Sequence, residues 1–174
     1  MSFSITIDLD SEGTTAALAE ALAPNLSAGD VICLHGSIGA GKSVFARAII
    51  RNRLNAMQID DDIPSPTYTL VQTYRAGDLE IWHSDLYRLN DPQDVAELGL
   101  DDAFRTGLCL IEWPERLGTA TPDNALHATL SDGDHDRARR LTLASSNPDW
   151  AVRLGPVLTE TGLLPHEEAR HACR

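Results

Sequence analysis

The segment GSIGAGKS, residues 36–43, is the strongest indication of the fold in this sequence. It matches the pattern G-x-x-x-x-G-K-[ST], in which backbone amides surround the oxygens of a bound phosphate. The apolar run 31–34 before it is typical of a strand covered on both faces, and residues 44–50 after it carry apolar side chains at helical spacing. We therefore expect a phosphate site built from the whole loop: Gly36, Ser37, Ile38, Gly39, Ala40, Gly41, Lys42 and Ser43.

The end of this loop carries the two side chains that favour a nucleotide with its metal. Lys42 is placed to bridge the outer phosphates, and the positive N-terminal end of the following helix points at the same anion. Ser43 offers a hydroxyl to Mg²⁺, which prefers oxygen ligands. ATP and Mg²⁺ are thus the expected ligands. The alternative is a plain glycine-rich turn with an exposed lysine, which the flanking strand and helix disfavour.

Two acids are positioned to serve a P-loop as a second metal or water ligand. Glu112 ends the apolar run 108–111, and Asp85 ends the strand-like segment LEIWHSD. Either acid could instead be a solvent-exposed charge at a strand end. Residues 65–67, Ser-Pro-Thr, form a stiff segment whose hydroxyls could meet a terminal phosphate as switch loops do, or could belong to an ordinary turn. His83 could bind a metal, but a hydrogen-bonded histidine is the preferred interpretation.

The rest of the chain predicts a single α/β domain. Alternation at 3–9 indicates a strand, Asp10 or Ser11 caps a helix that ends near Pro24, and a further helical stretch covers about 92–105. Strands are also expected in two antiparallel pairs, 69–75 with 79–85 and 125–130 with 139–145. The fold class is a three-layer P-loop NTPase-like domain at 1–146, with a mixed sheet of parallel centre and antiparallel edge strands. Residues 147–174 are expected to be a C-terminal tail, partly helical or disordered.

Composition narrows the function classes. The chain has 174 residues, 14 of them basic and 26 acidic, so its net charge is −12 and autonomous nucleic-acid binding is disfavoured. The first ten residues hold two Asp and no basic start, and no apolar stretch approaches membrane-spanning length. The three cysteines are far apart and form no C-x-x-C pair. A cytoplasmic protein without a membrane partner is expected.

Several motifs along the chain resemble one known family. GSIGAGKS, SPTYTLVQTY, HSDLYRL, ELGL and LIEWPERL, in that order between about Asp30 and Leu117, look like the TsaE family, also called YjeE. The similarity is weaker at the N-terminus and around 137–143. The resemblance implies a small P-loop ATPase that acts with the TsaB and TsaD proteins in threonylcarbamoyladenosine modification of tRNAs reading ANN codons. The tRNA would then be met only indirectly, through the complex.

The resemblance also implies roles for individual residues. Lys42 would hold the phosphates, Ser43 and Glu112 would meet Mg²⁺, and Thr67 would sense or orient the γ-phosphate. Asp85 matches an acid important for hydrolysis, acting through water or through the metal shell. Three further residues would lie near the nucleotide: Trp113, which could also face a partner or pack in the core, and the less securely aligned Glu12 and Arg137.

Phosphoryl-transfer chemistry extends these expectations to the rate of the reaction. No arginine stands out in the sequence as an arginine finger, the residue that stabilises the negative charge developing on the phosphate oxygens in the transition state. We therefore expect weak intrinsic ATPase activity that rises when partners complete the site. Two other functions stay open. A small-molecule kinase shares the P-loop but normally needs a cationic lid, and no Arg-rich lid segment is evident. A non-catalytic nucleotide sensor would bind ATP and a partner without turnover.

Overall fold

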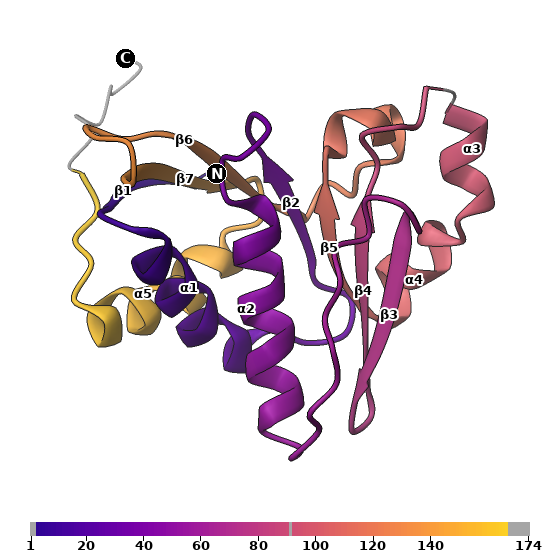
Figure 1. The fold of residues 1–174 in the computed structure, drawn as a ribbon, viewed down its shortest axis with the longest axis horizontal. Helices are drawn as coiled ribbons and strands as arrows, with labels where there is room; N and C mark the ends of the chain where they lie inside the picture. Colours follow the sequence, from indigo (N-terminus) through magenta and orange to yellow (C-terminus); the bar gives the residue numbers. More distant parts are fainter. Residues whose placement is uncertain (1–2, 91, 167–174) are drawn as a thin grey trace.

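A seven-stranded sheet forms the centre of the molecule, with strand order β1-β7-β6-β2-β5-β4-β3 (Figure 1). The computed structural model describes residues 3–90 and 92–166. The strands are β1 (Phe3–Leu9), β2 (Val31–His35), β3 (Val71–Ala76), β4 (Leu79–Asp85), β5 (Leu108–Glu112), β6 (Leu126–Asp132) and β7 (Arg139–Ser145). Both predicted antiparallel pairs are present, as β3 with β4 and β6 with β7.

The middle of the sheet is parallel and its outer parts contain antiparallel pairs. β2 pairs in parallel with β5 on one side and β6 on the other, and β4 pairs in parallel with β5. β7 runs antiparallel to both of its neighbours, β6 and β1. All five residues of β5 and the first four of β2 are buried, as their continuous apolar sequences predict. The mixed sheet of the predicted fold class is confirmed.

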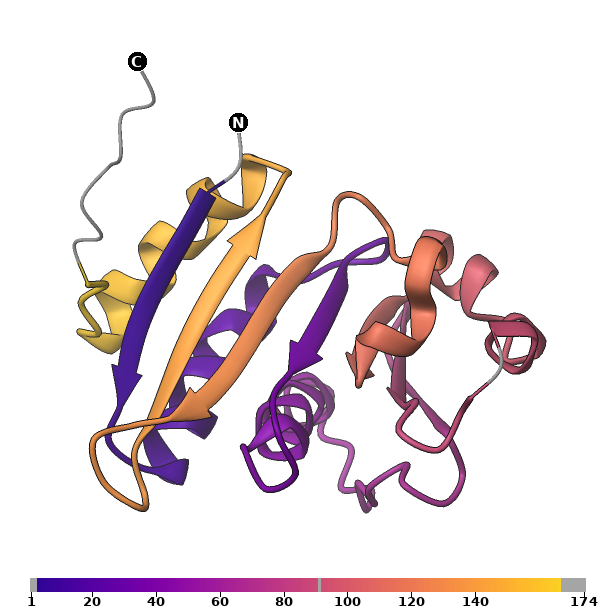
Figure 2. The ribbon, with the colours of Figure 1, turned by 90° about the horizontal axis from the view of Figure 1, so that it is seen from above.

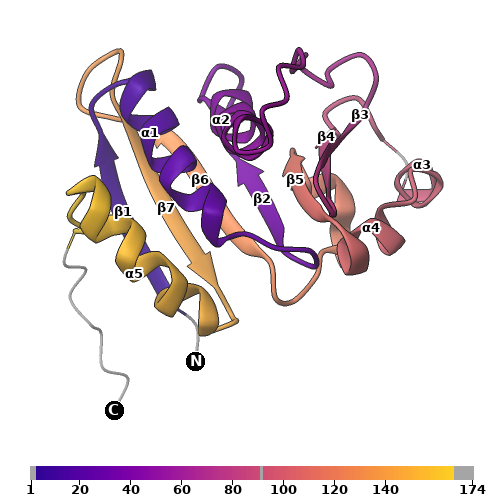
Figure 3. The same ribbon diagram turned by 90° about the horizontal axis from the view of Figure 1, so that it is seen from below.

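Helices cover both faces and make three layers. α1 (Glu12–Leu22), α2 (Lys42–Asn55) and α5 (Asp149–Thr161) lie on one face (Figure 3), where their apolar side chains join the larger core cluster. α3 (Pro92–Glu97), α4 (Leu100–Thr106) and the 3₁₀ segment η2 (Pro114–Ala120) lie on the other side (Figure 2) and enclose a smaller cluster. A further 3₁₀ turn, η1 (Ala23–Asn25), follows α1.

Local signals set the helix ends. The Ser11 hydroxyl accepts a hydrogen bond from the backbone amide of Thr14 at 3.2 Å, so the predicted N-cap is confirmed. The predicted helix at 92–105 is instead two short helices, α3 and α4. They separate because Gly99 has φ of +74°, which an α-helix cannot continue through.

The segment predicted as a tail contributes to the packing. Within it, α5 buries Trp150, Leu154 and Val157 in the core, and the Trp150 indole donates to the carbonyl of Asn124 at 2.8 Å. Residues 167–174 of that segment lie outside the described part of the chain. In the described residues no helix is both long and apolar enough to cross a membrane.

Candidate functional site

The glycine loop connects β2 to α2, so the predicted strand, loop and helix are confirmed. Gly36 has φ of +139°, and a Cβ there would lie 2.5 Å from the carbonyl oxygen of Leu130, so only glycine fits. Gly41, at φ of +105°, precedes the first turn of α2. That turn begins with Lys42 and Ser43, which brings both side chains and the positive end of the helix to the carboxyl edge of the parallel strands.

The two predicted acids lie at this same edge. Asp85 is the last residue of β4 and Glu112 is the last residue of β5, and the two are direct register partners in the parallel pair. Both are buried, with 6% and 3% of their surface exposed, so the alternative of solvent-exposed strand-end charges does not hold. Parallel pairing thus places two carboxylates beside the P-loop.

A cavity of about 440 Å³ brings these residues together. It is lined by residues of the P-loop and α2, the start of α1, the 65–67 segment and the ends of β4 and β5: Glu12, Ile38, Gly39, Gly41, Lys42, Ser43, Val44, Thr67, Asp85, Tyr87, Glu112 and Trp113. Among the described residues that line it, Lys42 is the only cation against three carboxylates. The cavity therefore carries an excess of negative charge, which a bound cation would reduce.

Glu112 is held at both carboxylate oxygens. Ser43 donates its hydroxyl to Oε2 at 2.9 Å, and His83 lies 2.8 Å from Oε1 through Nε2. His83 is fully buried. The histidine therefore adopts the preferred, hydrogen-bonded role.

Asp85 is connected to the 65–67 segment. Thr67 donates its hydroxyl to Oδ2 of Asp85 at 3.1 Å, and the backbone amide of Tyr87 donates to Oδ1 at 3.0 Å. The hydroxyl of Ser65 lies 2.8 Å from that of Thr67. The segment is thus linked to the end of β4 through one threonine side chain.

Lys42 lies over the indole of Trp113, its Nζ 4.2 Å from the ring centroid. Its ammonium donates to the carbonyls of Gly36 and Ser37 at 2.8 and 2.7 Å. Burial lowers the pKa of Lys42, and the carboxylates of Glu112, Asp85 and Glu115 partly offset that effect. Trp113 itself has a left-handed backbone, with φ of +59°, a strained conformation of the kind that gathers at functional sites.

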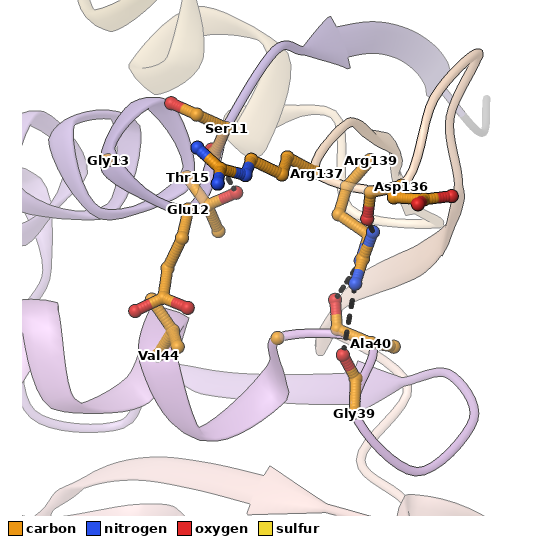
Figure 4. Close-up of a pocket in the computed structure, with 11 residues that line it drawn as sticks. Ser11, Glu12, Gly13, Thr15, Gly39, Ala40, Val44, Asp136, Arg137 and Arg139 are labelled. Atoms are coloured by element: carbon orange, nitrogen blue, oxygen red, sulfur yellow. Dashed lines mark hydrogen bonds between the residues drawn. The ribbon is translucent and has the colours of Figure 1, made fainter.

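A second cavity, of about 400 Å³, lies beside the first and shares Glu12, Gly39, Gly41 and Val44 with it. Figure 4 shows Arg137, from the β6–β7 loop, and Arg139, the first residue of β7, on one side of it, with Glu12 on the side of α1. Arg137 therefore lies at this second cavity, whose lining includes neither Asp85 nor Glu112. Ala40 also lines it, whereas Gly36 and Ser37 line neither cavity and take part through their carbonyls.

Arg139 is a contributor that the sequence analysis missed. Its guanidinium donates to the P-loop carbonyls of Ala40 and Gly39 at 3.2 and 3.3 Å (Figure 4). The residue is the first of β7, about a hundred positions along the chain from the loop that it contacts. Only the strand pairing brings it there, so no local sequence signal could identify it.

The donor set fits a hard cation in company with phosphates. In the described residues no group of three or more His, Cys, Asp or Glu side chains could hold a metal alone. Mg²⁺ usually needs only one or two protein oxygens, since waters and substrate phosphates complete its shell. The Ser43 hydroxyl and the Glu112 carboxylate, 2.9 Å apart, supply such a pair.

Comparisons with known proteins show what this chain is similar to. A family model described as "Threonylcarbamoyl adenosine biosynthesis protein TsaE" matches residues 9–141. The tRNA threonylcarbamoyladenosine biosynthesis protein TsaE of Rickettsia conorii is 44% identical over 107 residues, which cover 62% of this chain and 59% of that relative. Its Bacillus subtilis counterpart is 34% identical over 125 residues, covering 71% and 75% of the two chains.

The matched region thus spans less than two thirds of the Rickettsia conorii relative. A solved structure supports the fold. The chain superposes on the crystal structure of YdiB of Bacillus subtilis with a TM-score of 0.74 and 24% identity, covering 92% of this chain and 97% of that one.

Proposed function

Because the chain belongs to the TsaE family of threonylcarbamoyl adenosine biosynthesis proteins, we propose that it is an ATPase serving threonylcarbamoyladenosine modification of tRNA together with TsaB and TsaD. One observation carries the proposal. Lys42, Ser43, Thr67, Asp85 and Glu112 line a single cavity at the carboxyl ends of parallel strands. This is where P-loop proteins of the α/β class bind phosphorylated ligands.

The loop and Lys42 would bind the phosphates. Backbone amides of residues 36–43 and the N-terminal end of α2 offer positive partial charge to the anion. Lys42 would exchange its bonds to the Gly36 and Ser37 carbonyls for phosphate oxygens. Its contact with Trp113 would keep the ammonium over the cavity during that exchange.

Ser43 and Glu112 would hold Mg²⁺. When bound, this cation neutralises charge that develops on the phosphate oxygens during transfer. Its hydroxyl and carboxylate partners keep their position because one starts α2 and the other ends β5. The negative excess in the cavity would otherwise repel a triphosphate.

Asp85 would orient the attacking water and accept its proton. The carboxylate is buried and fixed from two sides, by Thr67 and by the amide of Tyr87. Thr67 would turn from Asp85 toward the terminal phosphate when ATP binds, which makes the 65–67 segment sensitive to the nucleotide state. The ATP and ADP states would then differ in affinity for the partner proteins.

The second cavity, which shares Glu12 and Val44 with the first, would receive the nucleoside. Arg137 and Glu12 would lie at its edge. Arg139 would hold the P-loop beside it through hydrogen bonds to the Ala40 and Gly39 carbonyls.

ATP turnover with and without TsaB and TsaD tests the proposal. We expect slow hydrolysis by the isolated chain and faster hydrolysis in the assembled system, because partners are expected to supply charge that this cavity lacks. With tRNA and an activated threonylcarbamoyl donor added to the same mixture, formation of threonylcarbamoyladenosine should require ATP and fail with a Glu112→Gln variant. An isolated rate equal to the assembled rate would remove the coupling, and phosphorylation of an added sugar or nucleoside would favour a kinase.

A further inference from the structure

His83 and Glu112 form a buried pair in this molecule. Nε2 of His83 lies 2.8 Å from Oε1 of Glu112, and the two residues are 0% and 3% exposed. His83 has no second contact of this kind, because its Nδ1 is buried without a hydrogen-bond partner among the described residues. The ring therefore bonds in one direction only, toward the carboxylate. A neutral ring must carry its proton on Nε2 to donate this bond.

The strand pairing fixes where this contact falls. His83 lies two residues before Asp85 on β4, so both side chains are on one face of the sheet. Asp85 is the register partner of Glu112, and His83 is the register partner of Leu110 two residues earlier on β5. One strand thus carries both the acid assigned to hydrolysis and the side chain that contacts the second acid.

The two carboxylate oxygens of Glu112 would differ in whether they keep their hydrogen bonds when a cation binds. Oε2 accepts from the Ser43 hydroxyl, and that hydroxyl is a candidate metal ligand in its own right, so this bond would be given up to the cation. Oε1 accepts from His83, which is out of reach of solvent and would keep its bond. Without the bond from His83, the Glu112 side chain would be fixed only when the cation binds, and the loss of side-chain conformational entropy would then weaken binding.

We propose that His83 is a positioning residue that holds the Glu112 carboxylate with Oε2 turned toward Mg²⁺. The inference rests on the proposed function, since it assumes that Glu112 meets the cation. Partners one step outside the ligands of a metal site set their orientation, and their loss typically lowers metal affinity or activity about 10- to 100-fold. His83 would act on magnesium and leave the phosphate contacts of the P-loop unchanged.

Calorimetric titration of ADP in EDTA and in Mg²⁺ tests the inference on four proteins. The ratio of the two affinities measures the contribution of magnesium separately from that of the phosphates. His83→Leu removes the donor at similar volume, and His83→Gln returns an N–H near the position of Nε2. Ser84→Ala is the matched control, because the neighbouring Ser84 hydroxyl is buried on the opposite face without a partner in the described residues.

We expect His83→Leu to lower the Mg²⁺ enhancement of ADP affinity about 10- to 100-fold, with affinity in EDTA near that of the wild type. His83→Gln should recover most of the enhancement, and Ser84→Ala should keep all of it. The Mg²⁺ concentration for half-maximal ATP turnover should rise in His83→Leu. If that variant fails to fold in a urea titration, His83→Asn replaces it, because its shorter amide reaches the place of Nδ1 rather than Nε2.

Three results would overturn the inference alone, each beside a wild type that shows the enhancement. The first is an unchanged enhancement in His83→Leu or His83→Asn, and the second is an equal loss in His83→Gln. The third is a parallel loss of affinity in EDTA, which indicates a purely structural role. A wild type that binds ADP equally well with and without Mg²⁺ would instead overturn the proposed metal site and this inference together.

Discussion

Replacing Asp85 by Asn removes one negative charge from the cavity and leaves its hydrogen bonds almost intact. The asparagine oxygen can accept from the amide of Tyr87, as Oδ1 does now at 3.0 Å. Its NH₂ group can donate to the Thr67 hydroxyl, which is free to donate in turn to Ser65, 2.8 Å away. Both contacts survive in neutral form.

The magnitudes separate the effect on stability from the effect on catalysis. A hydrogen bond to a charged group contributes roughly 1 kcal/mol more than a neutral one, so two such bonds bound the loss of unfolding free energy at about 2 kcal/mol. A positioned proton acceptor contributes about 10²- to 10⁴-fold in rate, equivalent to about 3 to 5 kcal/mol in the barrier. Asp85→Asn should therefore stay folded and lose most of its turnover.

Three measurements on one preparation check this prediction. Hydrolysis is followed with TsaB and TsaD present, where the rate is expected to be measurable, while urea unfolding and ADP calorimetry report stability and binding. Asp102→Asn on α4 is the control, because that side chain is exposed and ion-paired only with Arg105 among the described residues. Turnover close to the wild-type rate, or ADP affinity that falls as far as turnover does, would refute the role given to Asp85.

Residues of the core and of the P-loop determine stability and cysteine reactivity. Gly36→Ala should cost at least about 1 kcal/mol more in urea unfolding than Gly39→Ala, because its Cβ would meet the Leu130 carbonyl at 2.5 Å whereas a Cβ at Gly39 meets nothing within 4 Å. Trp150→Ala should lower the unfolding free energy by about 3 to 5 kcal/mol, since α5 packs in the core through this indole; a loss below 1 kcal/mol would contradict that packing. Burial raises the pKa of Cys33 and Cys109 from 9.0 to about 12, so in a Cys173→Ser background native protein at pH 8 should resist alkylation that the unfolded chain undergoes. Because the folded state holds these two thiol protons more tightly, their contribution to stability should be complete below pH 9 and fall as the pH rises from 9 toward 12.

Features governed by neighbouring residues were predictable from the sequence. The strand, loop and helix around the P-loop were predictable because the apolar run, the glycines and the helical spacing that specify them lie within twenty residues of one another. The same holds for the Ser11 cap and for the strand ends at Asp85 and Glu112. The break at Gly99 was missed, although the glycine that causes it is visible in the sequence.

Features governed by distant residues were not predictable. The contact of Arg139 with the P-loop and the bond from His83 to Glu112 depend on how strands far apart in the chain align. Register decides both, because a shift by one residue would turn His83 to the opposite face. Only the three-dimensional structure supplies that register. The packing of α5 on the core likewise joins residues far apart in the chain.

Binding of Mg²⁺ and an adenine nucleotide through Lys42 and the two strand-end acids can be measured in one titration. A non-hydrolysable ATP analogue with Mg²⁺ is titrated calorimetrically into the folded protein. We expect one saturable site per chain, with affinity lowered about 10- to 100-fold by Lys42→Ala, because the substitution removes charge-assisted hydrogen bonds to phosphate. The absence of any binding heat from a wild-type protein shown to be folded, or equal affinity in the variant, would contradict this expectation.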